Sequence, residues 1–496
     1  MAAPSPIRQL ASDAAVYGLS TLLARSVNYL LVPFYTNVFE PSDYGVISVV
    51  YAALVFGNIL FTYGMESSYL RHAAAADACR AQLVFSTAFW SLLLSALGLS
   101  LALVSLAAPV AQLLGLGMRH RDLVYWMALV LFLDTVAVVP MASLRLKRRA
   151  WLYAGLRTGN VLLNVLLNLG LILALGWGVE AVLASNAAAS LALAAFSLIL
   201  ERGQLRCVFD RGLWRAMLGF GLPFVPTGLG YAISESVDRL FLVRMPQEAA
   251  ARLYGADTTP VEVAGIYGAC YKLGVFMLLY VQMFRLAWQP FFLERGRDPK
   301  APTLFARIFT LFTALGALLF LAVSFFVRDL VRIGLPIGGR MRYVVDPAYW
   351  EGLFIVPLIL LAYLAQGWYV YASAGVFLRN RTRDLPWITL GGALLTLAGN
   401  AWGVPRYGMA ASAWTTLLSY LAMAVALLAR AQRYYPIPFA WRDLGGICLI
   451  TALAYALFLW LDPALGGRIL LLLFAIGSFI AFGWLPGRKG SGWGAG

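Results

Sequence analysis

Six cations lie inside stretches of this sequence that are otherwise long and apolar. Two of them, Lys272 and Arg285, are the only charges in the 21 residues that end at Phe292. A charge at the centre of a membrane span costs about 2.5–3.5 kcal/mol on insertion scales, so such a residue usually faces a partner or a wet cavity. A long side chain near a helix end costs less, because it reaches the headgroups. Depth therefore separates a binding role from snorkelling.

Depth favours a binding role most strongly for Arg25. It lies 12 residues after Asp13, which is about 18 Å along a helix. Arg285 and Lys272 lie about 13 and 15 Å from the nearest acidic residue at a span end, so their depth is intermediate. We predict that Arg25, Arg285 and Lys272 line a lumen that binds an anionic substrate, and snorkelling stays open for Lys272.

A polar stripe runs along the span that begins near residue 152. Arg157, Asn160, Asn164 and Asn168 stand at i, i+3, i+7 and i+11, within about 80° around a helix axis. One interpretation is hydrogen bonding between helices, with Arg157 snorkelling. The favoured interpretation is a wall of the same lumen, because helix packing rarely needs three asparagines in three turns.

Acidic residues form a second group of candidates. Asp134 is central in its span, so its carboxylate must pair, protonate or bind a coupling cation, and Arg25 is a candidate partner.

Glu66, Glu235, Asp238 and Arg239 lie near helix ends. Glu235 and Arg239 stand at i and i+4 and can neutralise each other, which is a structural role. A gate between lobes is the alternative.

The composition predicts an all-α integral membrane protein. The 496 residues are 61% hydrophobic and 12% charged, with a mean hydropathy of +0.78. About fourteen apolar stretches are long enough to cross a membrane as helices. They cover residues 14–38, 44–65, 82–109, 123–144, 152–176, 179–200, 216–241, 262–292, 304–327, 349–378, 385–403, 408–429, 443–461 and 469–486.

The net charge of +15 is spread between the spans, which argues against nucleic acid as a partner. If the N-terminus is inside, alternate connections hold 22 Lys and Arg residues on one side and 10 on the other. The positive-inside rule then places both termini in the cytoplasm. The first apolar segment is too long for a signal peptide and is expected to stay as a span.

The two halves of the chain resemble each other. A Trp-Gly-Val turn is expected to close one span at Trp177 and another at Trp402, and small residues follow each. These matches pair span five with span eleven and span two with span eight, which predicts two six-helix lobes in a parallel pseudo-twofold repeat. We therefore expect an N-lobe at 1–205, a C-lobe at 206–432 and two additional helices at 433–496.

Cofactor chemistry is not indicated. Cys79, Cys207, Cys270 and Cys448 show no disulfide framework. His72 and His120 have no metal-ligand partner at useful spacing, so neither a metal nor a cofactor is expected.

Four segments carry a family resemblance. They are YLLVPFYTNVFEPSDYGVISVVYA, YGMESSYLRHA, GLPFVPTGLGYAISESVDRLFLV and FRLAWQPFFLE. They resemble the oligosaccharide flippases, a polysaccharide-transporter branch of the multidrug/oligosaccharidyl-lipid/polysaccharide superfamily. The resemblance covers the whole chain. It implies a two-lobed alternating-access protein of the bacterial inner membrane that moves a polyprenyl-diphosphate-linked oligosaccharide from the cytoplasmic to the periplasmic leaflet.

The resemblance implies a role in cell-surface polysaccharide or lipopolysaccharide (O-antigen) biosynthesis, in contact with membrane lipid and with other polysaccharide-assembly proteins. Two alternatives stay open. A cation-coupled multidrug exporter of the same superfamily would carry an acidic residue deep in its first span, where this chain has Arg25. A membrane polysaccharide polymerase or ligase would need a catalytic constellation outside the bilayer, and the longest external connections, near 242–261 and 328–348, show none. We therefore expect a transporter and not an enzyme.

Overall fold

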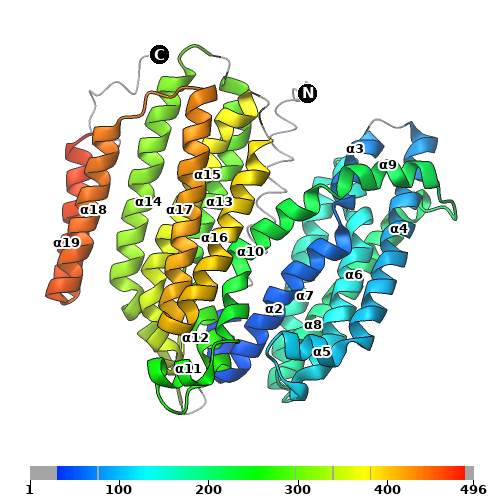
Figure 1. The fold of residues 1–496 in the computed structure, drawn as a ribbon, viewed down its shortest axis with the longest axis horizontal. Coiled ribbons are helices and arrows are strands. Elements are labelled where there is room, and N and C mark those ends of the chain that lie inside the picture. Colours follow the sequence, from blue (N-terminus) through cyan, green and yellow to red (C-terminus); the bar gives the residue numbers. More distant parts are fainter. Residues whose placement is uncertain are drawn as a thin grey trace. The chain divides into compact units, whose positions relative to one another are not determined.

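The computed structural model describes residues 31–74, 77–296, 298–337, 340–379, 381 and 383–485. These residues are almost entirely helical (Figure 1). Ten of the described helical segments are long and apolar enough to cross a membrane, and one bent pair of helices adds an eleventh. The protein is therefore a multi-pass membrane protein, as the composition predicts, because in lipid a helix satisfies its own backbone hydrogen bonds.

The first part of the chain forms seven labelled helices and two 3-10 turns. They are α2 (Pro41–Thr62), α3 (Met65–Ala74), α4 (Ala78–Ser105), α5 (Ala107–Leu113), η1 (Met118–His120), α6 (Arg121–Leu146), α7 (Ala150–Leu173), α8 (Glu180–Glu201) and η2 (Arg202–Gln204).

The rest of the chain continues with helices and one short hairpin. The helices are α9 (Arg211–Gly221), α10 (Phe224–Leu242), α11 (Gln247–Tyr254), α12 (Pro260–Lys272), α13 (Val275–Arg295), α14 (Ala301–Arg332), η3 (Pro347–Ile355), α15 (Val356–Leu378), α16 (Asp384–Tyr407), α17 (Met409–Tyr434), α18 (Trp441–Leu461) and α19 (Leu465–Ala481). Between α14 and η3, the antiparallel strands β1 (Gly334–Ile337) and β2 (Arg340–Tyr343) pair with Gly334 opposite Tyr343.

The span predictions are confirmed in outline. Spans two to fourteen each coincide with a helix or a consecutive pair, and residues 31–38 at the end of span one are helical. The rest of the first span, including Arg25, lies outside the described residues.

One span is broken by a bend, and one detail of the sequence interpretation is wrong. The expected span 262–292 coincides with α12 and α13, which meet at a bend of 48°. Trp402 does not close its span: α16 continues through Pro405 to Tyr407, and the turn comes at Gly408, whose φ of 56° is readily adopted by glycine. Trp177 does lie in the connection between α7 and α8.

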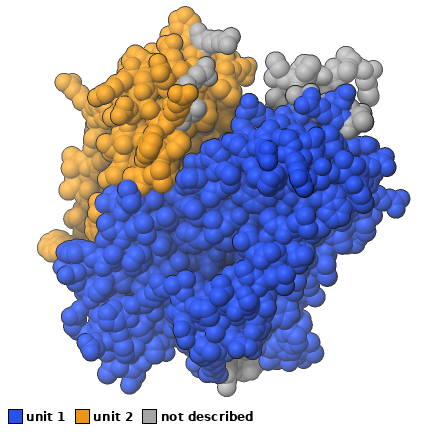
Figure 2. Space-filling model, turned by 45° about the vertical axis from the view of Figure 1, so that its right-hand side comes forward, with its two compact units in different colours: residues 1–269, 393–412 blue, residues 270–392, 413–496 orange. Residues whose placement is uncertain are grey.

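The chain divides into two compact units, coloured separately in Figure 2. Unit 1 comprises residues 1–269 and 393–412, and unit 2 comprises 270–392 and 413–496. The division into lobes at 1–205 and 206–432 with additional helices at 433–496 stays a prediction.

In unit 1, α6 packs against α8, α4 and α2, and α2 also packs against α10. A cluster of buried side chains that includes Met65, Phe85, Phe89 and Met217 joins α3, α4 and α9. Contact between apolar helices in lipid depends on close packing rather than on removal of surface from water. The position of α6 among these helices therefore places its polar residues against neighbouring helices.

In unit 2, aromatic rings fill the space between α13, α14 and α15. Trp288 stacks on Tyr371 with ring centroids 4.9 Å apart and meets Phe305 edge-on at 5.0 Å. Arg468 of α19 bonds to Asp329 of α14 at 2.6 Å, which ties the last described helix to this unit. Rings packed in offset and edge-on geometry contribute about 0.5–1.5 kcal/mol per pair beyond their buried area.

Candidate functional site

The Asp134 carboxylate lies among side chains from three other helices of unit 1. The Ser190 hydroxyl of α8 donates a hydrogen bond to Asp134 Oδ1 at 2.6 Å. Arg157 of α7 is close enough to act on the carboxylate electrostatically. Tyr51 of α2 hydrogen-bonds to Asn186 of α8, and the negative charge of Asp134 acts on Tyr51 electrostatically. Asp134 and Arg157, which the sequence placed in separate groups, thus lie within electrostatic range of each other.

The polar stripe of α7 has two parts. Asn168 is fully buried. Its Oδ1 accepts a bond from the Tyr35 hydroxyl at 2.8 Å, and its amide donates to Asn164 Oδ1 at 2.8 Å and to the Asn164 main-chain oxygen at 3.0 Å. Asn160 and Asn164 are half-buried and Arg157 is exposed. The Asn168 end of the stripe is therefore occupied by buried hydrogen bonds, whereas Arg157 at the other end is accessible.

Arg285 is exposed on α13 in unit 2. Its charge acts on Tyr369 of α15, whose hydroxyl lies 3.3 Å from Thr389 Oγ1 on α16. Gln282 is half-buried and Gln289 is exposed, on the helical face that they share with Arg285. This face thus presents a cation and two amides.

Lys272 is the last residue of α12, at the bend between α12 and α13. Leu273 and Gly274 connect the two helices, and a Cβ at Gly274 would lie 2.6 Å from an Ile359 methyl group of α15. A break at membrane depth is tolerated where protein or a water-filled cavity satisfies the backbone. The negative end of the α12 dipole also favours a cation there. The Lys-Leu-Gly sequence is the signal that could have indicated this break.

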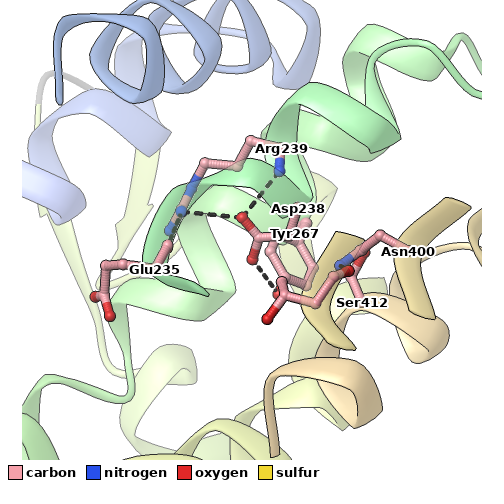
Figure 3. A network of polar contacts seen from close by, with 7 residues as sticks. Glu235, Asp238, Arg239, Tyr267, Asn400 and Ser412 are labelled. Atoms are coloured by element: carbon pink, nitrogen blue, oxygen red, sulfur yellow. Dashed lines mark hydrogen bonds and ion pairs between the residues drawn. The ribbon is translucent and has the colours of Figure 1, made fainter. Parts of the chain in front are cut away.

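Both oxygens of the Asp238 carboxylate accept hydrogen bonds (Figure 3). Asp238 is 3% exposed. Its Oδ2 accepts from the Tyr267 hydroxyl at 2.6 Å, and its Oδ1 accepts from the Arg239 main-chain N–H at 2.9 Å and from Arg239 Nη1 at 3.2 Å. Arg239 Nη1 also donates to the Glu235 main-chain oxygen at 2.9 Å. The sequence paired Arg239 with Glu235, and this pairing stays a prediction; the structure adds the Asp238 carboxylate as a bonded partner of Arg239.

Asn400 and Ser412 belong to the same group of polar side chains in Figure 3. Ser412 Oγ donates to Asn400 Oδ1 at 2.7 Å, and the Asn400 amide donates to the Thr396 main-chain oxygen at 2.9 Å. Tyr267, Asn400 and Ser412 were not among the sequence candidates. Each is a single polar residue in an apolar run, a signal that could have indicated them.

Glu66 forms an ion pair with Arg145 at 3.1 Å, between α3 and α6. The nearby Arg71 lies over the Phe220 ring at 4.3 Å from its centroid. A second pair joins Lys147 to the buried Glu201 at the end of α8, and Ser143 donates to the same Glu201 oxygen at 2.6 Å. Sequence analysis missed this pair, because both residues lie at span ends and neither stood out as a buried charge.

Helices α2 and α12 cross at a contact built from glycines. A Cβ at Gly45 would overlap the Val261 carbonyl oxygen, and a Cβ at Gly265 would overlap the Pro41 carbonyl oxygen. A Cβ at Gly268 would overlap the hydroxyl oxygen of the Ser48 side chain. Only residues without a side chain allow two backbones to approach so closely. These are the two helices, spans two and eight, that sequence analysis paired as repeats.

The described residues contain no group of three or more His, Cys, Asp or Glu that could hold a metal. In that part of the chain Cys207 and Cys448 are free and exposed, and the buried Cys270 thiol donates to the Tyr349 carbonyl at 3.2 Å. Arg25 lies outside the described residues, so its proposed pairing with Asp134 and its role beside Arg285 stay predictions.

Comparison with known proteins places this geometry in a fold family. The family model "Polysaccharide biosynthesis protein" matches residues 37–259. The chain is similar to the lipid II flippase MurJ in an inward closed conformation, with a TM-score of 0.73 at 13% identity over 94% of this chain and 98% of that one. A comparison with curated proteins found no match.

Two further solved structures have the same fold. One is a multidrug resistance MATE transporter of the MOP superfamily in an inward-facing conformation, with a TM-score of 0.63 at 13% identity over 85% of this chain and 97% of that one. The other is a MOP superfamily transporter from Pyrococcus furiosus, with a TM-score of 0.57 at 14% identity over 87% and 98%. The resemblance recognised in the sequence is confirmed: residues 37–259 match a polysaccharide biosynthesis protein family, and the chain has the fold of the MurJ flippase and the MATE transporters.

Proposed function

We propose that this protein is a flippase that moves a polyprenyl-diphosphate-linked oligosaccharide from the cytoplasmic to the periplasmic leaflet of a bacterial inner membrane, for cell-surface polysaccharide or lipopolysaccharide biosynthesis. The observation that carries the proposal is the set of cations Arg157, Lys272 and Arg285 within membrane-spanning segments of a chain with a flippase fold. A diphosphate carries negative charge through a region of low dielectric, and fixed cations lower that barrier.

Each cation has a distinct part in the proposed mechanism. Arg157 and Arg285 are exposed, so their guanidinium groups can offer a fork of donors to phosphate oxygens. Lys272 adds a point charge at the break between α12 and α13. Arg25 is proposed to join them. The lipid tail stays in the bilayer while the sugar and diphosphate cross.

The contact between α2 and α12 is proposed as the periplasmic gate. The positive-inside rule places the start of both helices on the outer side, and Gly45 and Gly265 lie near those ends. Closure there leaves the cytoplasmic side for substrate entry, and separation of the two backbones is the outward-facing step. In this scheme both chain termini face the cytoplasm.

The proposed cation role can be tested in a flippase-deficient strain. Arg285→Gln and Arg157→Gln are expected to abolish complementation with normal insertion, because amides cannot offset the diphosphate charge. The corresponding Lys variants should retain part of the activity, because they keep the charge without the fork. Arg307→Gln is a matched control, since this exposed arginine lies elsewhere, on α14. Full complementation by an Arg157→Gln, Arg285→Gln double variant is incompatible with the proposal.

A cation-coupled multidrug exporter is the second candidate function. Asp134 favours it, because a half-buried carboxylate beside a hydroxyl can bind a coupling ion. Expression in a drug-sensitive strain separates the two: resistance to cationic drugs that requires Asp134, without complementation of a flippase defect, would support the exporter. A polysaccharide polymerase or ligase is the least supported alternative, and release of extended glycan by the purified protein would establish it.

A further inference from the structure

A groove lined in part by charged side chains lies in unit 1, and none of its lining residues is a cation assigned to transport. It has a volume of about 970 Å³ and is formed by the end of α3, the start of α4 and the connection that leads into α9. His72, Arg80 and Arg206 line it with Gln82. The groove belongs to the side that the positive-inside rule places in the cytoplasm.

Two carboxylates in the groove wall are engaged at helix starts. Asp77 Oδ1 accepts the Arg80 main-chain N–H at 2.9 Å, and Asp210 Oδ1 accepts the Leu213 main-chain N–H at 2.9 Å. Each thus caps a helix and faces the positive end of its dipole. Within the described ranges, neither Arg80 nor Arg206 forms an ion pair with an acidic side chain. Their charge is therefore available to a ligand.

The main chain of Arg206 is held by two hydrogen bonds. Its main-chain N–H donates to Ser86 Oγ at 2.8 Å, and its carbonyl accepts from Trp90 Nε1 at 2.9 Å. Its side-chain Nε lies 3.4 Å from Gln82 Oε1. The terminal guanidinium nitrogens stay outside these bonds. A guanidinium with a fixed stem loses less conformational freedom on binding, and its planar fork matches the oxygens of a phosphate.

The groove has an apolar rim at Val208, which lines it and is 50% exposed. Phe209, the next residue in the sequence, is 42% exposed. Basic pockets with an apolar edge, between helices on the cytoplasmic side, are typical of sites for anionic lipid headgroups. A soluble phosphate compound would gain nothing from the exposed Val208 and Phe209.

We propose that this groove binds the phosphate group of an anionic ligand, with Arg80 and Arg206 as its cationic contacts. The apolar rim favours a membrane phospholipid as the source, with its headgroup in the groove and its acyl chains against Val208 and Phe209. A free phosphate compound offers the same recognised group and is separated from the lipid by the experiment. The site is distinct from the proposed transport cations, so it does not depend on the substrate that is moved.

The test measures binding to the full-length protein in detergent. Dioctanoyl phosphatidylglycerol, dioctanoyl phosphatidylcholine and inorganic pyrophosphate are titrated separately, at low and at high salt. Phosphatidylglycerol is expected to bind the wild type with an affinity that falls as the salt concentration rises. Its affinity for the Arg80→Gln, Arg206→Gln double variant is expected to be lower by roughly tenfold or more. The matched control is Arg430→Gln, Arg433→Gln, which removes the same charge from two exposed positions on α17.

Each outcome decides one point. A lipid headgroup site is supported if phosphatidylglycerol binding is lost in the groove double variant but not in the control, and if phosphatidylcholine and pyrophosphate bind the wild type weakly. Equal competition by pyrophosphate supports the site with a soluble ligand instead. Equal phosphatidylglycerol affinity in wild type, groove variant and control overturns the proposal. If the double variant does not fold, Arg80→Gln alone replaces it, because this side chain is exposed and its main-chain cap does not depend on it.

Discussion

Asp134 and Asp238 lie in the same compact unit, but their carboxylates differ in burial and in the number and charge of their hydrogen-bond partners. Asp238 is buried and accepts three hydrogen bonds, from Tyr267 and from two nitrogens of Arg239, which is also its counter-ion. Asp134 is half-buried, and within the described ranges its bonded partner is the neutral Ser190. A carboxylate with a full set of local partners stabilises one arrangement, whereas one with a single neutral partner can bind, release or exchange an ion.

The difference originates in where the cations lie. Arg239 follows Asp238 directly in α10, so the charge pair forms within one helix and Tyr267 only completes it. The cation near Asp134 is Arg157, on a different helix, where it is exposed. Movement between α6 and α7 therefore changes the surroundings of Asp134 and leaves the Asp238 pair intact. We infer that Asp238 has a structural role and Asp134 a transport role.

The largest expected effect comes from breaking the Asp238 group. Asp238→Ala leaves the guanidinium of Arg239, whose side chain is 13% exposed, without its carboxylate. Such a loss typically costs about 3–5 kcal/mol. The midpoint of thermal unfolding in detergent should fall accordingly. Asp238→Ala, Arg239→Met should recover part of the loss, because it also removes the buried cation that was bonded to Asp238. A midpoint unchanged by Asp238→Ala would remove the distinction between the two sites.

A second effect is expected at the glycine contact beside Tyr267. Gly265→Leu forces a side chain against the Pro41 carbonyl of α2, and overpacking of this kind costs about 1–3 kcal/mol. The measurement is the same thermal midpoint. Gly98→Leu is the matched control, since a Cβ at Gly98 meets nothing within 4 Å. Equal midpoints for the two variants would mean that α2 and α12 do not approach as closely as the structure indicates.

The asparagines of α7 test whether packing and transport roles separate along one helix. Asn168→Leu removes the partner of the Tyr35 hydroxyl, and an unsatisfied buried group costs about 1–3 kcal/mol. Asn164→Leu should cost about 1 kcal/mol or less, because Asn168 keeps its bond to the Asn164 main-chain oxygen. It should nevertheless depress transport. If both variants lose stability and transport in the same proportion, the whole stripe is a packing surface.

The smallest effect on stability is expected at Asp134. Asp134→Asn keeps the size of the side chain and an acceptor for Ser190, so the unfolding free energy should change by about 1 kcal/mol or less. Transport measured by complementation should fall sharply, because the charge is lost. Ser190→Ala provides the comparison, since it removes the bond and keeps the charge. Normal transport by Asp134→Asn would mean that Asp134, like Asp238, has a structural role.

The sequence by itself determined the helices. Spans two to fourteen were predictable from hydropathy, because a helix in lipid satisfies its own backbone and needs no distant partner. The charge asymmetry predicts a topology, which stays a prediction, and the asparagine stripe was visible as a periodicity. Even the glycines of the α2 and α12 contact were readable as weak repeat similarity, although not as a contact. The sequence grouped Glu235, Asp238 and Arg239 near one helix end, but it did not indicate that Arg239 would bond to Asp238.

Only the tertiary structure decided which polar residues meet. Ser190 is 56 residues from Asp134, Tyr35 is 133 residues from Asn168, and Tyr267 is 29 residues from Asp238. Such contacts depend on the rotation and depth of each helix against its neighbours, which hydropathy does not specify. At the break after Lys272, α15 approaches Gly274 closely, and hydropathy does not specify that contact either. The physical reason is that helix formation in lipid is local, whereas satisfying buried polar groups is a property of the packed bundle.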